Sequence, residues 1–450
     1  MKILLWHGYL LSGSGSNVYT ANVAASWRRQ GHEVLVMCQA RDAARFDFVD
    51  NEGDFSDTNS SFGLRPTGAT AAPGRCDVVR PALGGLLPVY VYDDYEGFVV
   101  KRFVDLDGVE LQNYVDRNVT AMETALRNFE PDVVITGHEV MGPFIAKVAC
   151  GNTGHAYIAK LHGSALEYAV KIQDRYLEYA REGLGSAAAV VGGSRYMLEA
   201  AAAVIPGWSH KGCVVNPGVD VDLFKPLANK SPATTVAYVG KLITEKGVHH
   251  LLAALGATHT EHLRAVIVGY GGDEDLMRSL WSALRAGDAV GATRVAEDLT
   301  PNEHLMKWLG SATPLAMARF AAIPLEFTGR LEHGPLSKVL PTFDVLVVPS
   351  VVPEAFGMVA AEAAACGVLP LVPTHSGISE AGEAIEDKLG LPGLLRFDHL
   401  DPIAGIATGI DRLLAIDPPE RLDMGIQAVE LATERWSWDR VGDGLLAAAV

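Results

Sequence analysis

Two hydrophobic patterns alternate along the chain. Short apolar runs of about five residues, rich in β-branched side chains and ended by glycine or polar residues, predict strands buried on both faces. Between them, apolar residues recur every three or four positions, which predicts helices, the first over 18–30. The predicted strands of this first series are 2–6, 31–38, 132–136, 157–163 and 188–194. Such βαβ alternation is typical of a doubly wound α/β fold with a parallel sheet.

A second series of the same kind follows. Its predicted strands are 235–242, 264–271, 323–329, 344–350 and 367–373. Because 450 residues are too many for one ordinary core, we expect two Rossmann-like domains, over 1–210 and 211–425. The last stretch, 426–450, has a helical pattern, and we expect it to return to the first domain.

Two segments interrupt the alternation. Residues 42–76 are rich in polar residues, glycine and proline, which predicts a long loop without regular structure. Residues 276–320 are helical in pattern and longer than one crossover connection requires.

Composition and charge exclude several classes of function. Hydrophobic residues make up 49% of the chain and charged residues 20%, as in a globular protein. The formal net charge of −17 argues against a nucleic-acid partner. Five cysteines without CxxC spacing predict free thiols in a reducing compartment. The apolar start of the chain is interpreted as a strand and not as a signal peptide. The sequence contains no run of 18 apolar residues that would predict a transmembrane helix, so we expect a cytoplasmic protein.

Glycine-rich turns follow two of the predicted strands. In the first, 13–17 (GSGSN), glycines let a ligand approach the backbone at a helix N-terminus. The dinucleotide fingerprint GxGxxG lacks its third glycine because Val18 stands there, and no carboxylate ends the second strand, which argues against an NAD dehydrogenase. The second turn, 268–276, is interpreted as tight-turn geometry.

Cations and imidazoles also stand at strand ends. Lys241 and Lys246 follow a strand of the second series, where they suit a diphosphate, although a solvated loop would carry lysines too. His162 ends a strand of the first series and could hydrogen-bond a hydroxyl or a leaving oxygen. A structural histidine is the alternative, as it is for His138 and Glu139.

Glu354 and Glu362 flank an apolar segment after the strand 344–350. If a helix begins near Gly357, free backbone amides lie beside Glu354. The two carboxylates could be a hydrolytic pair, or they could hold a phosphate and a polyol. Three Asp pairs do not follow apolar strands as a divalent-metal site would require, so no metal is expected: Asp105 and Asp107, Asp220 and Asp222, and Asp273 and Asp275.

These motifs together resemble the retaining nucleotide-sugar glycosyltransferases of family 4, which have the GT-B fold of two Rossmann-like domains facing across a cleft. The resemblance is closest in the second half of the chain and looser in the first. The motifs that carry it are E-A-F-G-M-V-A-A-E (354–362), V-G-K-L-x-x-E-K-G (239–247), N-P-G-V-D-x-x-x-F (216–224), F-T-G-R-L (327–331), H-S-G-I-S-E (375–380), G-S-G-S-N (13–17) and L-H-G-S (161–164).

The resemblance implies a role for each matching position. Gly15 and Ser16 would face the donor phosphates, and His162 would contact the sugar near its anomeric centre. Lys241 and Lys246 would neutralise the leaving diphosphate. The remaining donor contacts would be Glu354 with the amides of Phe356 and Gly357 on sugar hydroxyls, the amides of Met358 and Val359 on the phosphates, Glu362 on the ribose, and the backbone at Arg330 and Leu331 on the base.

The resemblance therefore implies a metal-independent, retaining hexosyltransferase that uses a nucleoside-diphosphate sugar, with a UDP-sugar favoured and no other cofactor. A sugar phosphorylase, a nucleotide-sugar hydrolase or epimerase, and a non-catalytic nucleotide-sugar-binding protein are the alternatives. The family usually has arginine at Lys241, and lysine keeps the charge but not the fork geometry. The acceptor is not specified, since 42–76 and 90–115 in the acceptor-side domain are unusual. The negative charge disfavours tight binding to an anionic membrane but is compatible with a lipid acceptor.

Overall fold

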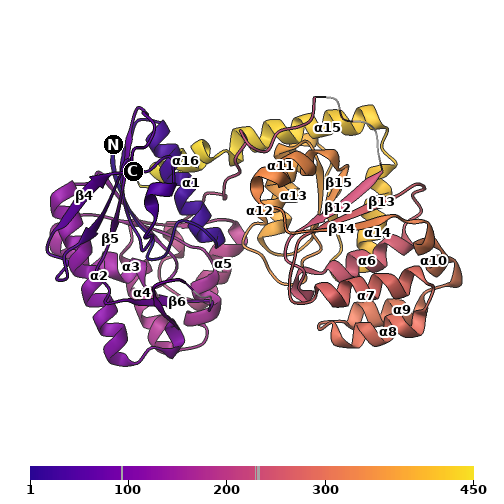
Figure 1. Cartoon of the computed structure of the whole chain (residues 1–450), viewed down its shortest axis with the longest axis horizontal. Helices are drawn as coiled ribbons and strands as arrows, with labels where there is room; N and C mark the ends of the chain where they lie inside the picture. The colour runs from indigo at the N-terminus through magenta and orange to yellow at the C-terminus, as the bar shows by residue number, and fades with distance from the viewer. Residues whose placement is uncertain (93–94, 229, 231–233, 450) are drawn as a thin grey trace. The chain divides into compact units, whose positions relative to one another are not determined.

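A computed structural model describes residues 1–92, 95–228, 230 and 234–449 (Figure 1). The chain forms two compact units, which are described separately. Unit 1 comprises Met1–Pro217 and the segment from Trp438 onward, and unit 2 comprises Gly218–Ser437. Asp93 and Asp94 of the 90–115 segment, and Val450 of the predicted returning helix, lie outside the described residues.

The unit boundaries differ from those predicted at 210 and 425. Fully buried Trp436 packs edge-on against Phe356, with ring centroids 5.6 Å apart, in the core of unit 2. Two residues later Trp438 packs edge-on against Tyr19 at 5.5 Å in unit 1. The chain therefore returns to unit 1 between these two tryptophans, later than the hydrophobic pattern indicated.

The described part of unit 1 has a sheet in the order β11-β10-β9-β8-β1-β2-β5-β3-β4. Its strands pair in parallel, except that β4 runs antiparallel to β3. The strands are β1 (Lys2–Trp6), β2 (Glu33–Met37), β3 (Asn51–Phe55), β4 (Phe62–Pro66), β5 (Arg75–Arg80), β8 (Val133–Gly137), β9 (Ile158–Lys160), β10 (Ala189–Gly192) and β11 (Gly212–Val214). A separate parallel pair joins β6 (Leu86–Val89) to β7 (Val99–Arg102).

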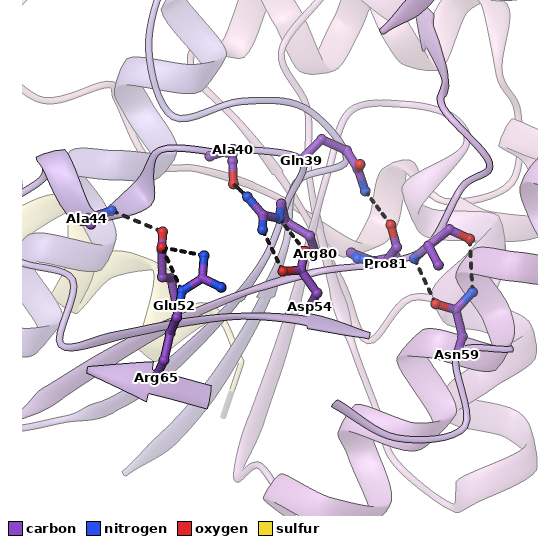
Figure 2. A network of polar contacts seen from close by, with 10 residues as sticks. Gln39, Ala40, Ala44, Glu52, Asp54, Asn59, Arg65, Arg80 and Pro81 are labelled. Carbon is purple, nitrogen blue, oxygen red and sulfur yellow. Dashed lines mark hydrogen bonds and ion pairs between the residues drawn. The ribbon is translucent and has the colours of Figure 1, made fainter. Parts of the chain in front are cut away.

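The prediction of an irregular loop over 42–76 is wrong, because β3, β4 and the start of β5 lie there. Polar side chains that looked like loop residues pair across these strands, as Figure 2 shows. Arg65 of β4 donates to Glu52 of β3 over 2.8 Å, and Arg80 of β5 donates to Asp54 of β3 over 2.6 Å. The hairpin extends the sheet with charged pairs, so it lacks the apolar runs that identify the central strands.

Helices cover both faces of this sheet. They are α1 (Gly15–Arg29), α2 (Gly108–Phe129), α3 (Gly142–Thr153), α4 (Asp174–Ser186), α5 (Arg195–Val204) and α16 (Trp438–Ala448), and α16 packs on α1. The first helix begins at Gly15 and not at the predicted Val18, because Ser14 caps it by accepting from the amide of Asn17 over 3.4 Å. Gly15 and Ser16 therefore lie in the first turn of α1.

Unit 2 has a parallel sheet whose described strands follow the order β14-β13-β12-β15-β16-β17. The strands are β12 (Thr235–Val239), β13 (Arg264–Val268), β14 (Leu325–Gly329), β15 (Val345–Val347), β16 (Leu369–Pro373) and β17 (Arg396–Phe397). Five of them fall in the five segments predicted for the second series, and the short edge strand β17 was not predicted.

The helices of unit 2 include the helical insertion predicted over 276–320. They are α6 (Val248–Ala257), α7 (Glu274–Arg285), α8 (Ala289–Asp298), α9 (Glu303–Ser311), α10 (Pro314–Arg319), α11 (His333–Val339), α12 (Met358–Ala365), α13 (Ser376–Leu389), α14 (Pro402–Leu414) and α15 (Pro418–Leu431). Of the helices in the described residues, none combines the length and apolarity needed to cross a bilayer. All five cysteines are free.

Candidate functional site

The carboxyl ends of three central strands of unit 1 bring imidazoles together. His7 follows β1, His138 follows β8 and His162 follows β9. The ring centroids of His138 and His162 are 4.8 Å apart, and those of His7 and His138 are 5.7 Å apart. We call these three histidines, with Glu139 and Lys160, the first-unit cluster. Sequence analysis named His162 as a site residue, but the strand order, which makes β8 the neighbour of both β1 and β9, was needed to place the others beside it.

Burial keeps these imidazoles neutral. It lowers the pKa of His7 to about 4, although a hydrogen bond of 2.7 Å to the Asn17 side chain favours protonation. Burial also holds the pKa of His162 well below its ordinary value, and nearby His138 and Lys160 add to the effect. At neutral pH His162 is therefore a hydrogen-bonding group without charge.

The first-unit cluster also contains two buried ionisable groups, Glu139 and Lys160. Glu139 is fully buried, and its Oε1 accepts from the backbone amides of His162 (3.2 Å) and Gly163 (2.6 Å). Lys160 is 3% exposed, its ammonium lies 5.1 Å from the ring centroid of Tyr19, and burial lowers its pKa to about 8. No sequence pattern indicates the Glu139 contact, since its partners are 23 and 24 residues away.

Gly15 and Ser16 lie in the first turn of α1, beside Asn17, whose side chain hydrogen-bonds His7. A Cβ added at Gly15 would meet no atom within 4 Å, so the backbone there is open to a ligand. Amides in the first turn of a 15-residue helix, with its positive end, suit an anion.

In unit 2 the structure joins two of the residues predicted for the donor site. Lys246 Nζ donates to Glu354 Oε1 over 2.9 Å, and both side chains are partly exposed. Gly247, at φ +71°, allows this approach: a Cβ there would lie 1.9 Å from the backbone oxygen of Pro349. Without a side chain at Gly247, the turn after β12 packs directly against the segment after β15.

The backbone of Glu354 is held from the start of α13. Its amide donates to Ser376 Oγ over 3.0 Å, and its carbonyl accepts from Gly377 N over 2.9 Å. Ser376 itself adopts a left-handed φ of +57°, which is unusual for a residue with a side chain. His375 joins the same corner by hydrogen-bonding the carbonyl of Ser350 over 3.0 Å. The H-S-G-I-S-E motif does not by itself indicate this contact.

Helix α12 begins at Met358, directly after Gly357 and close to the predicted start. Gly357 has φ +83°, and a Cβ there would lie 2.7 Å from Ile378. No residue in the described part of the chain accepts from the backbone amides of Gly357, Met358 and Val359. Phe356 is 2% exposed, so its side chain belongs to the core while its backbone leads into the helix.

Glu362 lies inside α12 and is 8% exposed. Burial raises the pKa of its carboxyl to about 8. His333 lies nearby, with its Nε2 3.9 Å from Glu362 Oε1. At neutral pH a protonated Glu362 can both donate and accept a hydrogen bond.

Arg330 and Leu331 follow β14. The Arg330 guanidinium contacts Glu332 at 2.7 Å and Tyr270, whose hydroxyl lies 3.2 Å away and whose ring centroid lies 4.9 Å away. Tyr270, 45% exposed after β13, is an aromatic surface that sequence analysis missed. The side chain of Lys241 is exposed and has no partner among the described residues, while its backbone oxygen accepts from Tyr238 over 2.7 Å.

We call Lys241, Lys246, Glu354 and the backbone amides of 357–359 the second-unit cluster.

The glycine-rich turn after β13 packs on the turn that carries Lys241. A Cβ at Gly269 would lie 1.8 Å from the carbonyl oxygen of Gly240, and one at Gly271 would lie 2.2 Å from that of Leu242. These close approaches explain Gly269 and Gly271 without a ligand.

The Asp pairs have structural partners. Asp107 caps α2, Asp220 accepts from the amides of Asp222 and Leu223, and Asp273 accepts from the amide of Thr244 over 2.7 Å. Within residues 1–92, 95–228, 230 and 234–449, no group of three His, Cys, Asp or Glu side chains is arranged to hold a metal ion.

Two family models match this chain. Residues 14–218 match the glycosyl transferase 4-like domain, and residues 315–428 match the glycosyl transferases group 1. The chain belongs to the family 4 glycosyltransferases. The two matched regions contain His162 and the segment from Arg330 to Glu362, whereas Lys241 and Lys246 lie between them.

Curated relatives of this family 4 glycosyltransferase include the D-inositol 3-phosphate glycosyltransferases of Mycobacterium leprae and Mycobacterium tuberculosis. Both are 28% identical over 243 residues, which is 52% of this chain. The match spans 47% of the first relative and 42% of the second, so the chain covers about half their length.

Solved structures establish the GT-B fold of this family 4 glycosyltransferase. The sucrose-phosphate synthase of Thermosynechococcus elongatus is similar with a TM-score of 0.59 and 16% identity, covering 99% of this chain and 97% of its own. Anabaena HepE in complex with UDP and glucose has a TM-score of 0.58 and 14% identity, covering 99% and 98%. At this identity the likeness concerns the fold alone.

Proposed function

We propose that this protein transfers a hexosyl group from a nucleoside-diphosphate sugar, with a UDP-sugar favoured, to a hydroxyl acceptor. The transfer retains the anomeric configuration and needs no metal ion. The acceptor is unidentified, and a cytoplasmic location remains a prediction.

The observation that carries the proposal is the Lys246–Glu354 ion pair beside the open amides of α12. A leaving diphosphate gains negative charge as its bond to the sugar breaks, and ammonium groups and helix amides stabilise such charge when they are fixed in advance. Lys246 and Lys241 supply the cations, and Met358 and Val359 supply amides. Glu354, whose backbone amide donates to Ser376, would accept hydrogen bonds from sugar hydroxyls.

Retention is part of the proposal because the resemblance to the family 4 enzymes implies it. Glu354, whose carboxylate is paired with Lys246, is assigned to the sugar hydroxyls and not to nucleophilic attack. We expect the acceptor to attack from the same face of the sugar from which the leaving group departs. The bond from the anomeric carbon to the phosphate oxygen breaks, the bond to the acceptor oxygen forms, and the acceptor proton passes to that phosphate oxygen. A neutral His162 hydrogen-bonds the sugar near this centre.

The preference for UDP is supported by proteins of the same fold. Anabaena HepE was solved with UDP, with UDP and glucose, and with UDP-glucose, and a trehalose-6-phosphate protein from E. coli was solved with UDP-2-fluoro glucose. The mycobacterial relatives are named for D-inositol 3-phosphate, which makes phosphorylated polyols a reasonable first set of acceptors to test.

A thermal-shift screen of UDP-, GDP- and ADP-sugars in the presence of EDTA tests the donor, because a ligand raises stability by RT ln(1 + [L]/Kd). We expect a UDP-sugar to raise Tm. Nucleoside-diphosphate release is then measured with a panel of acceptors, and proton NMR of the product gives the anomeric configuration. An inverted product, or activity that EDTA abolishes, would contradict the proposal.

The same assay separates the alternatives. A phosphorylase would form a sugar phosphate only when free phosphate is present. A hydrolase or epimerase would consume the donor without an acceptor. A non-catalytic binding protein would show the thermal shift but no nucleoside-diphosphate release with any acceptor.

A further inference from the structure

The polar contacts of unit 1 change character where the chain leaves β9. Up to Leu161, backbone amides are satisfied by neighbouring strands: His138 N donates to the Lys160 carbonyl over 2.8 Å, and Leu161 N donates to Val191 over 2.9 Å. The next two amides, of His162 and Gly163, donate to the Glu139 carboxylate instead. One side chain therefore replaces the sheet as the acceptor at the point where His162 leaves it.

A carboxylate is a costly acceptor in this position. Glu139 is fully buried, burial raises its pKa, and its Oε2 has no hydrogen-bond partner among the described residues. It is preceded by His138, which holds a left-handed φ of +72°. Strained backbone and an incompletely paired buried carboxyl group persist where the surrounding fold fixes them, commonly at functional sites.

The held segment leads to a ring whose orientation matters. Gly163 turns the chain with φ +89°, and His162 lies between the rings of His138 (4.8 Å between centroids) and Tyr19 (5.4 Å). No described residue hydrogen-bonds its ring nitrogens. The ring's orientation is therefore set by packing and by the backbone below it.

We infer that Glu139 is a positioning residue: its carboxylate, at the end of β8, fixes the backbone of His162 and Gly163 and so holds the His162 imidazole in its working orientation. The inference rests on the proposed function for its kinetic consequence but not for its structural one. It assigns Glu139 no contact with donor or acceptor.

The kinetic test compares Glu139→Ala, Glu139→Gln and His162→Ala in the full-length protein. Glu139→Ala removes the acceptor of both amides, so we expect kcat to fall about 100-fold, since a misplacement near 1 Å has this effect. Donor Kd should stay within about twofold, because the groups assigned to the diphosphate and nucleoside lie mainly in unit 2. Glu139→Gln keeps an oxygen acceptor and should restore kcat to within about tenfold of the wild type.

A double-mutant cycle decides whether the effect passes through His162. In the His162→Ala background, Glu139→Ala should lower kcat by less than about threefold further, because coupled residues are non-additive. A full 100-fold further loss, or a raised acceptor KM with unchanged kcat, would overturn the positioning role. Glu52→Ala is the matched control: this 9% exposed carboxylate also accepts a backbone amide in unit 1, from Ala44 over 3.2 Å (Figure 2), and its loss should not change kcat.

NMR of the labelled histidine rings tests the inference apart from catalysis. The His162 signal, assigned by its loss in His162→Ala, should shift or broaden in Glu139→Ala and return toward its wild-type position in Glu139→Gln. An unchanged His162 signal in folded Glu139→Ala would overturn the inference. A wild-type protein without transfer activity, or a His162→Ala variant with full activity, would instead contradict the proposed function. If Glu139→Ala does not fold, Glu139→Gln and Glu139→Asp carry the comparison, and Asp, one methylene shorter, should disturb the ring more than Gln.

Discussion

The two clusters hold polar groups in opposite ways. In the first-unit cluster, charged and imidazole side chains are sealed: Glu139, His138 and Lys160 are at most 3% exposed. In the second-unit cluster, Lys241 is exposed, Lys246 and Glu354 are partly exposed, and the backbone amides of 357–359 have no acceptor among the described residues. The first arrangement suits fixing a neutral group in place, and the second suits attracting a multiply charged ligand.

The largest effect should come from removing a cation of the open cluster. Lys246→Ala deletes the charge assigned to the leaving diphosphate and leaves Glu354 without its partner, so we expect kcat/KM to fall about 1000-fold. Steady-state kinetics with the donor found in the screen would measure it. Lys388→Ala is the control, because Lys388 also pairs with carboxylates in unit 2, at Glu430 and Glu434. Turnover of Lys246→Ala close to the wild type would contradict the view that the second-unit cluster acts by attracting a charged ligand.

The open cluster should also depend on tight backbone packing beneath it. Gly247→Ala places a Cβ 1.9 Å from the Pro349 carbonyl oxygen at a left-handed φ, so we expect Tm to fall by about 8 °C. Gly390→Ala is the matched control: Gly390 has nearly the same φ, +70°, but a Cβ there meets nothing within 4 Å. Only the conformational cost remains, and Tm should fall by about 3 °C. Equal losses in thermal unfolding would mean that the close approach relaxes freely.

Glu362 is a buried carboxyl group in unit 2, close in sequence to the exposed second-unit cluster, and its protonation can be tested. Because burial raises its pKa to about 8, the carboxyl is largely protonated at pH 7, and Glu362→Gln replaces it with a neutral group of similar shape. Donor Kd in Glu362→Gln should stay within about threefold of the wild type, whereas Glu362→Ala should weaken binding about tenfold. Calorimetric titration at pH 7 measures both. A larger loss in the Gln variant would show that the ionised carboxylate binds the donor.

The smallest effects should come from two buried groups of unit 2, Glu362 and His249, which should make the stability of the protein depend on pH in opposite directions. The pKa of Glu362 rises from 4.5 to about 8, so its folded form keeps a proton that the unfolded chain loses, and stability falls as pH rises through this range. The pKa of His249 falls from 6.5 to about 4, so stability falls as pH drops through that range. Glu362→Gln and His249→Phe should each flatten one limb of the Tm profile, by about 2–4 °C. An unchanged profile in either variant would contradict its shifted pKa.

The sequence predicted most of the fold because the central strands are buried on both faces. Runs such as Val236, Ala237 and Tyr238 show no alternation and stand between clear helical patterns, so their strands could be found without a structure. The strands β3 and β4 were missed because their stabilising groups are charged. Asp54 and Arg65 look like loop residues until the hairpin places Arg80 and Glu52 opposite them.

The candidate site divides in the same way. That Lys246 and Glu354 follow adjacent strands, β12 and β15, could be inferred from a doubly wound sheet, and the structure joins them. The contact of Glu139 with His162 could not be inferred, because it depends on a left-handed residue at His138 and on a chain reversal at Gly163. Side-chain to backbone contacts of this kind leave no periodic trace in a sequence.

Gly247 has a consequence for anyone who would transplant or redesign the Lys246–Glu354 pair. The separation between the lysine and the glutamate is set by a missing methyl group, because the Pro349 carbonyl occupies the place where a side chain would begin. Copying Lys246 and Glu354 into another scaffold would therefore reproduce the charges without their spacing. A transplant should include both the turn after β12 and the segment after β15, with Gly247 where they meet. Sequence libraries that vary position 247 should return glycine almost alone.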